Sequence, residues 1–219
     1  MSQRREKHAG PGRPRDEDLA DRRRREIVRH AIEEFARNGF NGADLDAIAA
    51  NAGCSKGTLY NYFESKGALF SASVDHVMFS LVDALGDEGD ESDPVEQIER
   101  LAVNFLRHFA QHPQYVELLV QERADFKDRQ EPTYYRYRET SRAKWLRRFE
   151  WLIAQGRMRP MPPERALTVM SDLLYGTIFM NHFRHRRITP ERQAADVVNV
   201  LLGGLLTEDA FATHAPPNP

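Results

Sequence analysis

Apolar residues recur at intervals of three and four along nearly the whole chain, and proline and glycine interrupt this pattern. Ile27, Ala31, Ile32 and Phe35 show the spacing, which places side chains on one buried face of an α-helix. No segment alternates polar and apolar residues with a period of two for long enough to predict a strand with any assurance. The sequence therefore predicts an all-α fold.

The helix boundaries follow from the residues that interrupt the pattern. A helix through residues 27–36 stops at Asn38-Gly39, where glycine suits the left-handed backbone that ends a helix. Further helices are predicted over 44–53, 56–62, 65–86, 94–111, 115–129, 132–156, 163–186 and 190–207. Proline stands at or beside most of the later boundaries, because it tolerates the first turn of a helix but not the interior. The acidic stretch 86–94 is the expected joint between two units, 21–86 and 87–212.

The net charge of −2 conceals an uneven distribution. Residues 1–29 contain ten basic side chains and six acidic ones, so the remainder of the chain is acidic. A basic leading segment is typical of a chain whose front end meets a polyanion, although charge runs are usually only solvated. We also find no apolar run near the roughly 18 residues that cross a bilayer, no signal peptide, and one cysteine. A cytoplasmic protein that does not associate with membranes fits these features.

Residues 44–63 form two short predicted helices joined by a glycine-containing turn. This is the arrangement of a helix-turn-helix motif: Ala49 is small where the helices cross, and Gly53 permits the positive φ of the turn. Ser55, Lys56 and Thr58 then lie on the exposed first turn of the second helix, where side chains reach base edges or phosphates. A three-helix bundle without a ligand is the alternative, but the spacing favours DNA binding.

Residues 27–70 resemble the DNA-binding domain of the TetR/AcrR family of bacterial regulators. Phe35, Gly39-Phe40, Ile48-Ala49, Ala52-Gly53 and the run from Tyr60 to Lys66 carry the resemblance. It implies that the second helix binds double-stranded operator DNA, with Ser55, Lys56, Gly57 and Thr58 in the major groove and Tyr60, Tyr62 and Lys66 on phosphates. We include Asn61 of the same helix in the predicted DNA-binding set.

A basic arm precedes this domain. Gly12-Arg13-Pro14-Arg15 resembles the core of an AT-hook, which is thin enough for Arg13 and Arg15 to enter a narrow minor groove. Simple attraction to phosphates is an equally good interpretation. We expect residues 1–20 to be a flexible basic arm, 21–86 the helix-turn-helix domain, 87–212 a helical ligand-binding and dimerisation domain, and 213–219 a disordered tail.

Large aromatic side chains and a few polar ones share the inner faces of the later helices. An ordinary core with structural ion pairs would explain them, but the resemblance implies a mostly apolar inducer pocket with polar anchors. The predicted ligand-binding residues are Phe105, Glu122, Phe126, Trp145, Phe149, Asp172, Tyr175 and Phe179.

The last two predicted helices carry apolar runs, around Leu173 to Gly176 and over 197–206. Gly203 and Gly204 each cost a helix about 1 kcal/mol relative to alanine, which close approach of another helix would offset. The resemblance implies a homodimer interface made by two helices of each subunit, and internal core is the alternative.

Other functional classes find little support. The pairs His108/His112 and His182/His185 have helical spacing, but a proline and several arginines beside them disfavour a metal site, and we expect no cofactor. The sequence has no catalytic constellation and does not indicate an enzyme. The predicted function is therefore a TetR-like regulator, a repressor that a small molecule releases from a palindromic operator. The alternative is an all-helical DNA-binding or interaction protein without an inducer switch.

Overall fold

The computed structural model describes residues 16–86, 93–127, 132–184, 186 and 188–205 of the chain. Within these ranges it contains nine α-helices and no strand, which confirms the predicted all-α fold. The helices are α1 (Asp16–Gly42), α2 (Leu45–Asn51), α3 (Lys56–Tyr62), α4 (Lys66–Leu85), α5 (Pro94–Gln111), α6 (Pro113–Asp125), α7 (Thr133–Ala154), α8 (Pro163–Arg184) and α9 (Pro190–Leu205).

Several helix boundaries differ by a few residues from the sequence-based prediction; α6, for example, spans Pro113–Asp125 where 115–129 was predicted, and α1 differs most. Helix α1 already begins at Asp16, so the last five residues of the expected flexible arm are helical. At its other end the backbone leaves helical geometry at Gly39 (φ 73°, ψ 165°) as predicted, but one more turn continues to Gly42. Three sequence-based predictions concern residues that lie outside the described ranges. They are the minor-groove contacts of Arg13 and Arg15, the acidic joint over 87–92 and the tail over 213–219.

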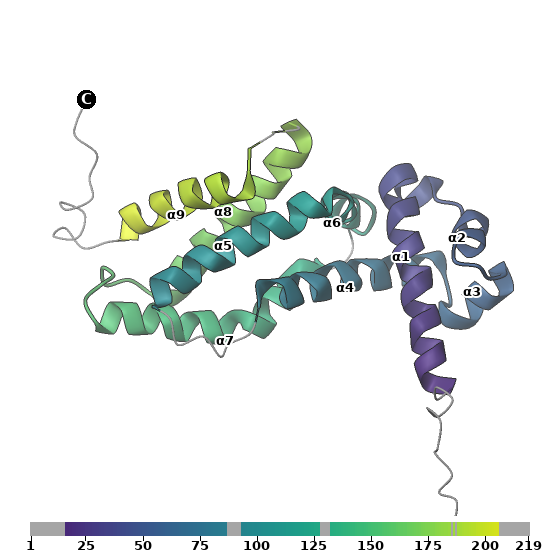
Figure 1. Ribbon diagram of the computed structural model, residues 1–219, viewed down its shortest axis with the longest axis horizontal. Helices are drawn as coiled ribbons and strands as arrows, with labels where there is room; N and C mark the ends of the chain where they lie inside the picture. Colours follow the sequence, from purple (N-terminus) through teal and green to yellow (C-terminus); the bar gives the residue numbers. More distant parts are fainter. Residues whose placement is uncertain (1–15, 87–92, 128–131, 185, 187, 206–219) are drawn as a thin grey trace, which may run out of the picture.

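Helices α1, α2 and α3 enclose a small apolar core at one end of the molecule (Figure 1). Ile27 and Phe35 of α1, Ile48 of α2 and Leu59 of α3 are fully buried there. Burial of each such side chain stabilises the fold by roughly 1.5–3 kcal/mol. The short helices α2 and α3 are thereby held at a fixed angle despite having only seven residues each.

The remaining helices, α4 to α9, pack on one another in the rest of the molecule. Helix α5 lies along α9, α7 packs on α8, and α4 contacts both α5 and α7. Ile98, Leu118 and Phe149 are fully buried in this part. By length and mean hydropathy (1.4), α4 alone among the described helices could span a membrane. Seven of its residues, including Phe70 and Val74, are buried inside the protein instead, so its composition is that of a core helix.

An aromatic cluster joins the two parts. Phe70 of α4 lies 5.1 Å from Phe35 and 5.1 Å from Phe126 between ring centroids, and Phe40 lies 4.8 Å from Phe126. The side-chain amide of Gln121 in α6 also donates a hydrogen bond (2.9 Å) to the carbonyl of Phe35. The helix-turn-helix unit is therefore packed on α4 and α6 through specific contacts.

Candidate nucleic-acid interface and ligand cavity

Side-chain caps fix the start of α2, α3 and α4. Asp44 accepts a hydrogen bond from the backbone N–H of Asp46 (2.8 Å), and Ser55 accepts one from that of Thr58 (3.1 Å). Ser65 caps α4 in the same way through Ala68. Gly53 has a φ of 65°, a conformation that residues with a Cβ rarely adopt. The φ of Gly53 confirms the turn predicted from the sequence, and the caps orient α3 against α2.

Helix α3 presents its first turn and one side to solvent. Ser55, Lys56, Gly57 and Asn61 are exposed, and Tyr60 is 44% exposed. A Cβ added to Gly57 would have the Ser55 hydroxyl, at 3.7 Å, as its one neighbour within 4 Å among the described residues. Among the other residues of the predicted DNA-binding set on this helix, Thr58 is half-buried and Tyr62 packs partly on the core.

Lys56 at the start of α3 pairs with an acidic side chain of α2. Its Nζ donates a hydrogen bond to Asp46 Oδ2 (2.8 Å), and both side chains are largely exposed. This hydrogen bond is the main reason why the pKa of Lys56 is raised above its usual value. Asp46 thus places a carboxylate beside the surface of α3 that the sequence predicts to meet phosphates.

Lys66 has a structural task that the sequence did not reveal. Its Nζ donates to the carbonyls of Asn41 (3.0 Å) and Ala43 (2.7 Å) and lies 5.5 Å from the centre of the Phe40 ring. The ammonium therefore ties α4 to the segment between α1 and α2, and only one of its three N–H groups is left for a phosphate. Arg23 has a comparable structural role, since its guanidinium donates a hydrogen bond (2.8 Å) to the backbone carbonyl of Ala52.

A helix-turn-helix with an exposed, capped second helix on a three-helix core defines a DNA-binding protein. Residues 27–73 match the family model described as bacterial regulatory proteins, tetR family. Over these residues the chain carries the DNA-binding domain of the TetR family of bacterial regulators.

Individual relatives agree with this assignment. The HTH-type transcriptional repressor SCO4008 of Streptomyces coelicolor is 36% identical over 100 residues, which cover 46% of this chain and 49% of the relative. The repressor NicS of Pseudomonas putida is 30% identical over 104 residues, 47% of this chain and 49% of the relative. The chain thus spans about half the length of these curated relatives.

A solved structure extends the likeness to the later helices. A TetR family transcription regulator from Marinobacter aquaeolei VT8 has a TM-score of 0.69, and the superposition covers 88% of this chain and 100% of that one. Because the two sequences are only 21% identical, this comparison establishes the shared fold alone.

A mostly apolar cavity lies between the C-terminal half of α4 and helices α5, α7 and α8. Its volume is about 80 Å³. The lining residues are Met78, Leu81, Val82, Leu85, Leu101, Phe105, Tyr137, Arg142, Trp145, Leu167, Met170, Ser171, Leu174 and Tyr175. Phe105, Trp145 and Tyr175 belong to the predicted ligand-binding set, so three of those eight residues meet at one cavity.

The other five lie elsewhere. Glu122 is 1% exposed, and its carboxylate accepts hydrogen bonds from the backbone N–H and the hydroxyl of Thr133. It therefore caps the start of α7 and is not available to anchor a ligand. Phe126 belongs to the aromatic cluster between the two parts of the molecule.

The remaining three are distributed over core and surface. Phe149 is fully buried in the core, and Phe179 packs on that core one turn beyond Tyr175 without reaching the cavity. Asp172 is exposed, because the helical step from the buried Ser171 turns it away from the cavity. These five residues do not line this cavity, and their part in ligand binding stays a prediction.

The sequence analysis did not predict that residues of α4 line this cavity. Met78, Leu81 and Leu85 recur at intervals of three and four on one face of that helix, and Leu167, Met170 and Leu174 do so on α8. This pattern marked the residues as buried, but the same pattern marks every core residue of a helix. Periodicity alone therefore could not distinguish the wall of a cavity from ordinary core.

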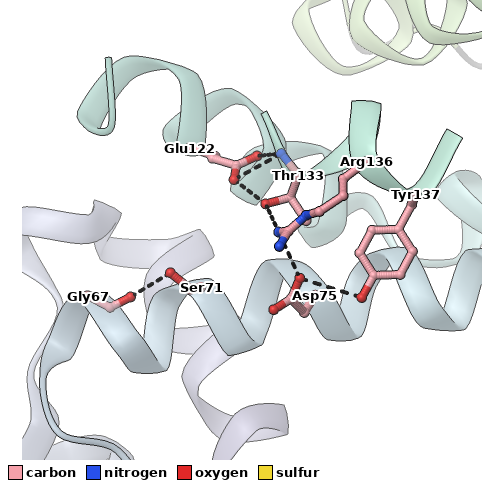
Figure 2. A network of polar contacts seen from close by, with 7 residues as sticks. All are labelled: Gly67, Ser71, Asp75, Glu122, Thr133, Arg136 and Tyr137. Carbon is pink, nitrogen blue, oxygen red and sulfur yellow. Dashed lines mark hydrogen bonds and ion pairs between the residues drawn. The ribbon is translucent and has the colours of Figure 1, made fainter. Parts of the chain in front are cut away.

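A polar network connects the cavity wall to the outer side of α4 (Figure 2). Tyr137 lines the cavity, and its hydroxyl donates to Asp75 of α4 (3.5 Å). Arg136 contacts the same carboxylate (3.4 Å) and the Thr133 hydroxyl (3.5 Å), which in turn bonds to Glu122. Burial, helped by the nearby Asp75 carboxylate, raises the pKa of Tyr137 to about 12, so this phenol stays a neutral donor.

Proposed function

We propose that this protein is a homodimeric repressor that leaves a palindromic operator when a small apolar or amphipathic molecule binds in the cavity between α4, α5, α7 and α8. The observation that carries this proposal is that the two ends of α4 pack against different parts of the molecule. Its first turns, with Leu69 and Phe70, pack in the helix-turn-helix unit, and its last turns, with Leu81 and Leu85, form a wall of the cavity. Helix α4 thus contacts the helix-turn-helix unit at one end and lines the proposed ligand cavity at the other.

The size of the cavity supports such a coupling. At about 80 Å³ it is smaller than the roughly 300 Å³ at which ligand pockets begin. A ligand must therefore separate the lining helices, and Tyr137 links one of them, α7, to Asp75 on α4. A ligand that prefers the separated arrangement tenfold shifts the DNA-binding equilibrium by about 1.4 kcal/mol, and a hundredfold preference shifts it by about 2.7 kcal/mol.

An exposed apolar stripe on α8 and α9 supports the homodimer. Val169 (43% exposed), Met180 (41%) and Phe183 (56%) lie along α8, and Val200 (69%) lies on α9. Gly176 falls in the same stripe, and no atom of the described residues lies within 4 Å of a Cβ added there, which leaves room for a second helix. Two copies that pair these faces in a four-helix arrangement would remove this apolar surface from water and space two α3 helices for a palindrome.

In this proposal the start of α3 contacts the DNA bases, through Ser55, Lys56, Gly57 and Thr58. The rest of α3 contacts the DNA phosphate backbone, through Tyr60, Asn61 and Tyr62, and Lys66 has a mainly structural role. Arg13 and Arg15 belong to the proposed basic arm. Such a regulator works where the bacterial DNA is, in the cytoplasm. A DNA-binding protein of the same fold without an inducer switch is the competing function, and the ligand experiment below distinguishes the two.

Asp46→Asn is expected to strengthen binding to DNA of any sequence by a few-fold at low salt. The change removes a carboxylate that repels the DNA beside α3, and it leaves the positive charge of Lys56 without its acidic partner. Gel-shift titrations with operator and with unrelated duplex at two salt concentrations measure the effect, which should shrink as salt rises. The matched control is Glu64→Gln, an exposed acid that follows α3. Unchanged or weaker binding by Asp46→Asn contradicts the assignment of this surface to DNA.

Tryptophan emission provides the test of the inducer proposal. Trp145 lines the cavity, so compounds that quench its emission should release operator DNA over the same concentration range. Trp145→Ala should weaken both effects together, whereas Trp151→Phe, at a 44% exposed site outside the cavity, should leave the release of DNA intact. Ligands that bind in the cavity without changing DNA affinity would favour the competing function.

A further inference from the structure

A second and larger cavity lies at the other end of α8. Its volume is about 280 Å³, close to the lower end of the range for small-molecule sites. It is enclosed by α5, α6, the C-terminal turns of α8, the segment between α8 and α9, and the start of α9. None of its lining residues belongs to the cavity of the proposed inducer, so the two spaces are separate.

The floor of this second cavity is apolar. Leu106 and Phe109 of α5, Val116 of α6 and Ile178 of α8 line it, and each of these residues is at most 3% exposed. Ile188 adds a further apolar side chain from the segment before α9. A ligand that fills the floor must therefore have an apolar body.

The polar residues of the wall bond mainly to one another. Asn181 and Gln193 exchange two amide hydrogen bonds (2.6 and 2.7 Å), and His182 Nε2 lies 2.8 Å from Glu117 Oε2. Because these side chains already form hydrogen bonds within the protein, they shape the wall of the cavity but do not require a charged group on the ligand. The Glu117 carboxylate is held by His182 and is not itself among the lining residues.

Arg186 is different. This residue lines the cavity and is solvent-exposed, and no carboxylate in the described part of the chain forms an ion pair with it. Its backbone N–H is bonded to the carbonyl of Asn181 (3.2 Å), which holds the residue at the end of α8. An arginine fork above an apolar floor matches a molecule with an apolar body and one carboxylate, because guanidinium and carboxylate form paired, charge-assisted hydrogen bonds.

We propose that this second cavity binds a small organic acid, with its apolar part on Phe109 and Ile178 and its carboxylate on Arg186. The site also adjoins the DNA-binding unit. Pro113 and His182 line a neighbouring depression together with Glu33, Ala36 and Arg37 of α1. An acid bound here contacts the residues that pack on α1 without entering the cavity beside α4.

Calorimetric titration of the full-length protein with 4-phenylbutanoate and with its uncharged match, 4-phenylbutanamide, tests this site. The wild-type protein should bind the acid about tenfold or more tightly than the amide, the contribution of one charge-assisted pair. Arg186→Gln should abolish this preference. Arg184→Gln, an exposed arginine on the same segment outside the cavity, should preserve it. Ala110→Phe, at an exposed lining position, should weaken binding of both compounds by filling the entrance.

Three results would overturn the proposal. One is equal affinity of the wild-type protein for acid and amide, or no binding of either. Another is the same loss in Arg184→Gln as in Arg186→Gln. The third is loss of acid binding in Trp145→Ala but not in Ala110→Phe, which would place the acid in the cavity beside α4. None of these measurements contains DNA, so their outcome is independent of the proposed repressor function.

Discussion

The double substitution Met180→Asp and Phe183→Asp is expected to convert the proposed dimer into a monomer and to reduce operator affinity by about a hundredfold or more. Both side chains are exposed in the single chain, at 41% and 56%, and both lie on the apolar stripe of α8. Carboxylates there would have to be buried unpaired if the two faces still met. Operator affinity falls because a monomer loses the second half-site, and linked binding to two sites contributes roughly a hundredfold or more.

Light scattering and gel-shift titration measure the two parts of this result. Trp151→Asp is the matched control, since it places the same charge at an exposed apolar position of α7 that lies outside the stripe. This control should leave both the mass and the operator affinity unchanged. A wild-type protein with the mass of one chain at micromolar concentration would contradict the proposed dimer.

Phe70→Ala is expected to lower the free energy of unfolding by about 3–5 kcal/mol, the usual cost of deleting a buried phenyl ring. Phe70 is fully buried and lies 5.1 to 5.3 Å from the rings of Phe35, Phe40 and Phe126. Its loss opens a void where α1, α4 and α6 meet, so both parts of the molecule lose packing. For a chain of this size each kcal/mol lowers the melting temperature by about 2–4 °C.

Phe79→Ala is the comparison, because it removes the same ring from the same helix. Phe79 is 61% exposed, and the centre of its ring lies 5.0 Å from that of Tyr137. Its truncation should cost less than about 1 kcal/mol. Chemical denaturation followed by circular dichroism gives both values. Equal losses in the two variants would show that the aromatic cluster does not hold the helix-turn-helix unit on α4.

The fold and the DNA-reading helix could be predicted because they depend on neighbours in the sequence. Helical periodicity shows within a few turns, and the caps of Asp44, Ser55 and Ser65 reach only two or three residues ahead. The positive φ of Gly53 is likewise a property of one residue. Exposure of α3 followed from the same pattern, since its polar positions fall on one side of a short helix.

The residues that line the cavity beside α4 could be predicted only in part. Phe105, Trp145 and Tyr175 do meet at one cavity, but the aromatic and acidic character that selected them also selected residues with other tasks. Composition identifies side chains that are suited to a pocket. It does not show whether a pocket or another helix lies opposite them, because that depends on how distant segments pack.

The all-α fold, most helix boundaries and the exposed second helix of the helix-turn-helix follow from local sequence, because hydrogen bonds and side-chain spacing within a few residues control these features. What each buried face contacts depends instead on how distant helices pack. Glu122 became the cap of α7, Phe126 joined the cluster around Phe70, and Lys66 reached back to the carbonyl of Ala43. Each of these outcomes requires two helices to meet at one angle and distance, and many helices far apart in the sequence share the same periodicity.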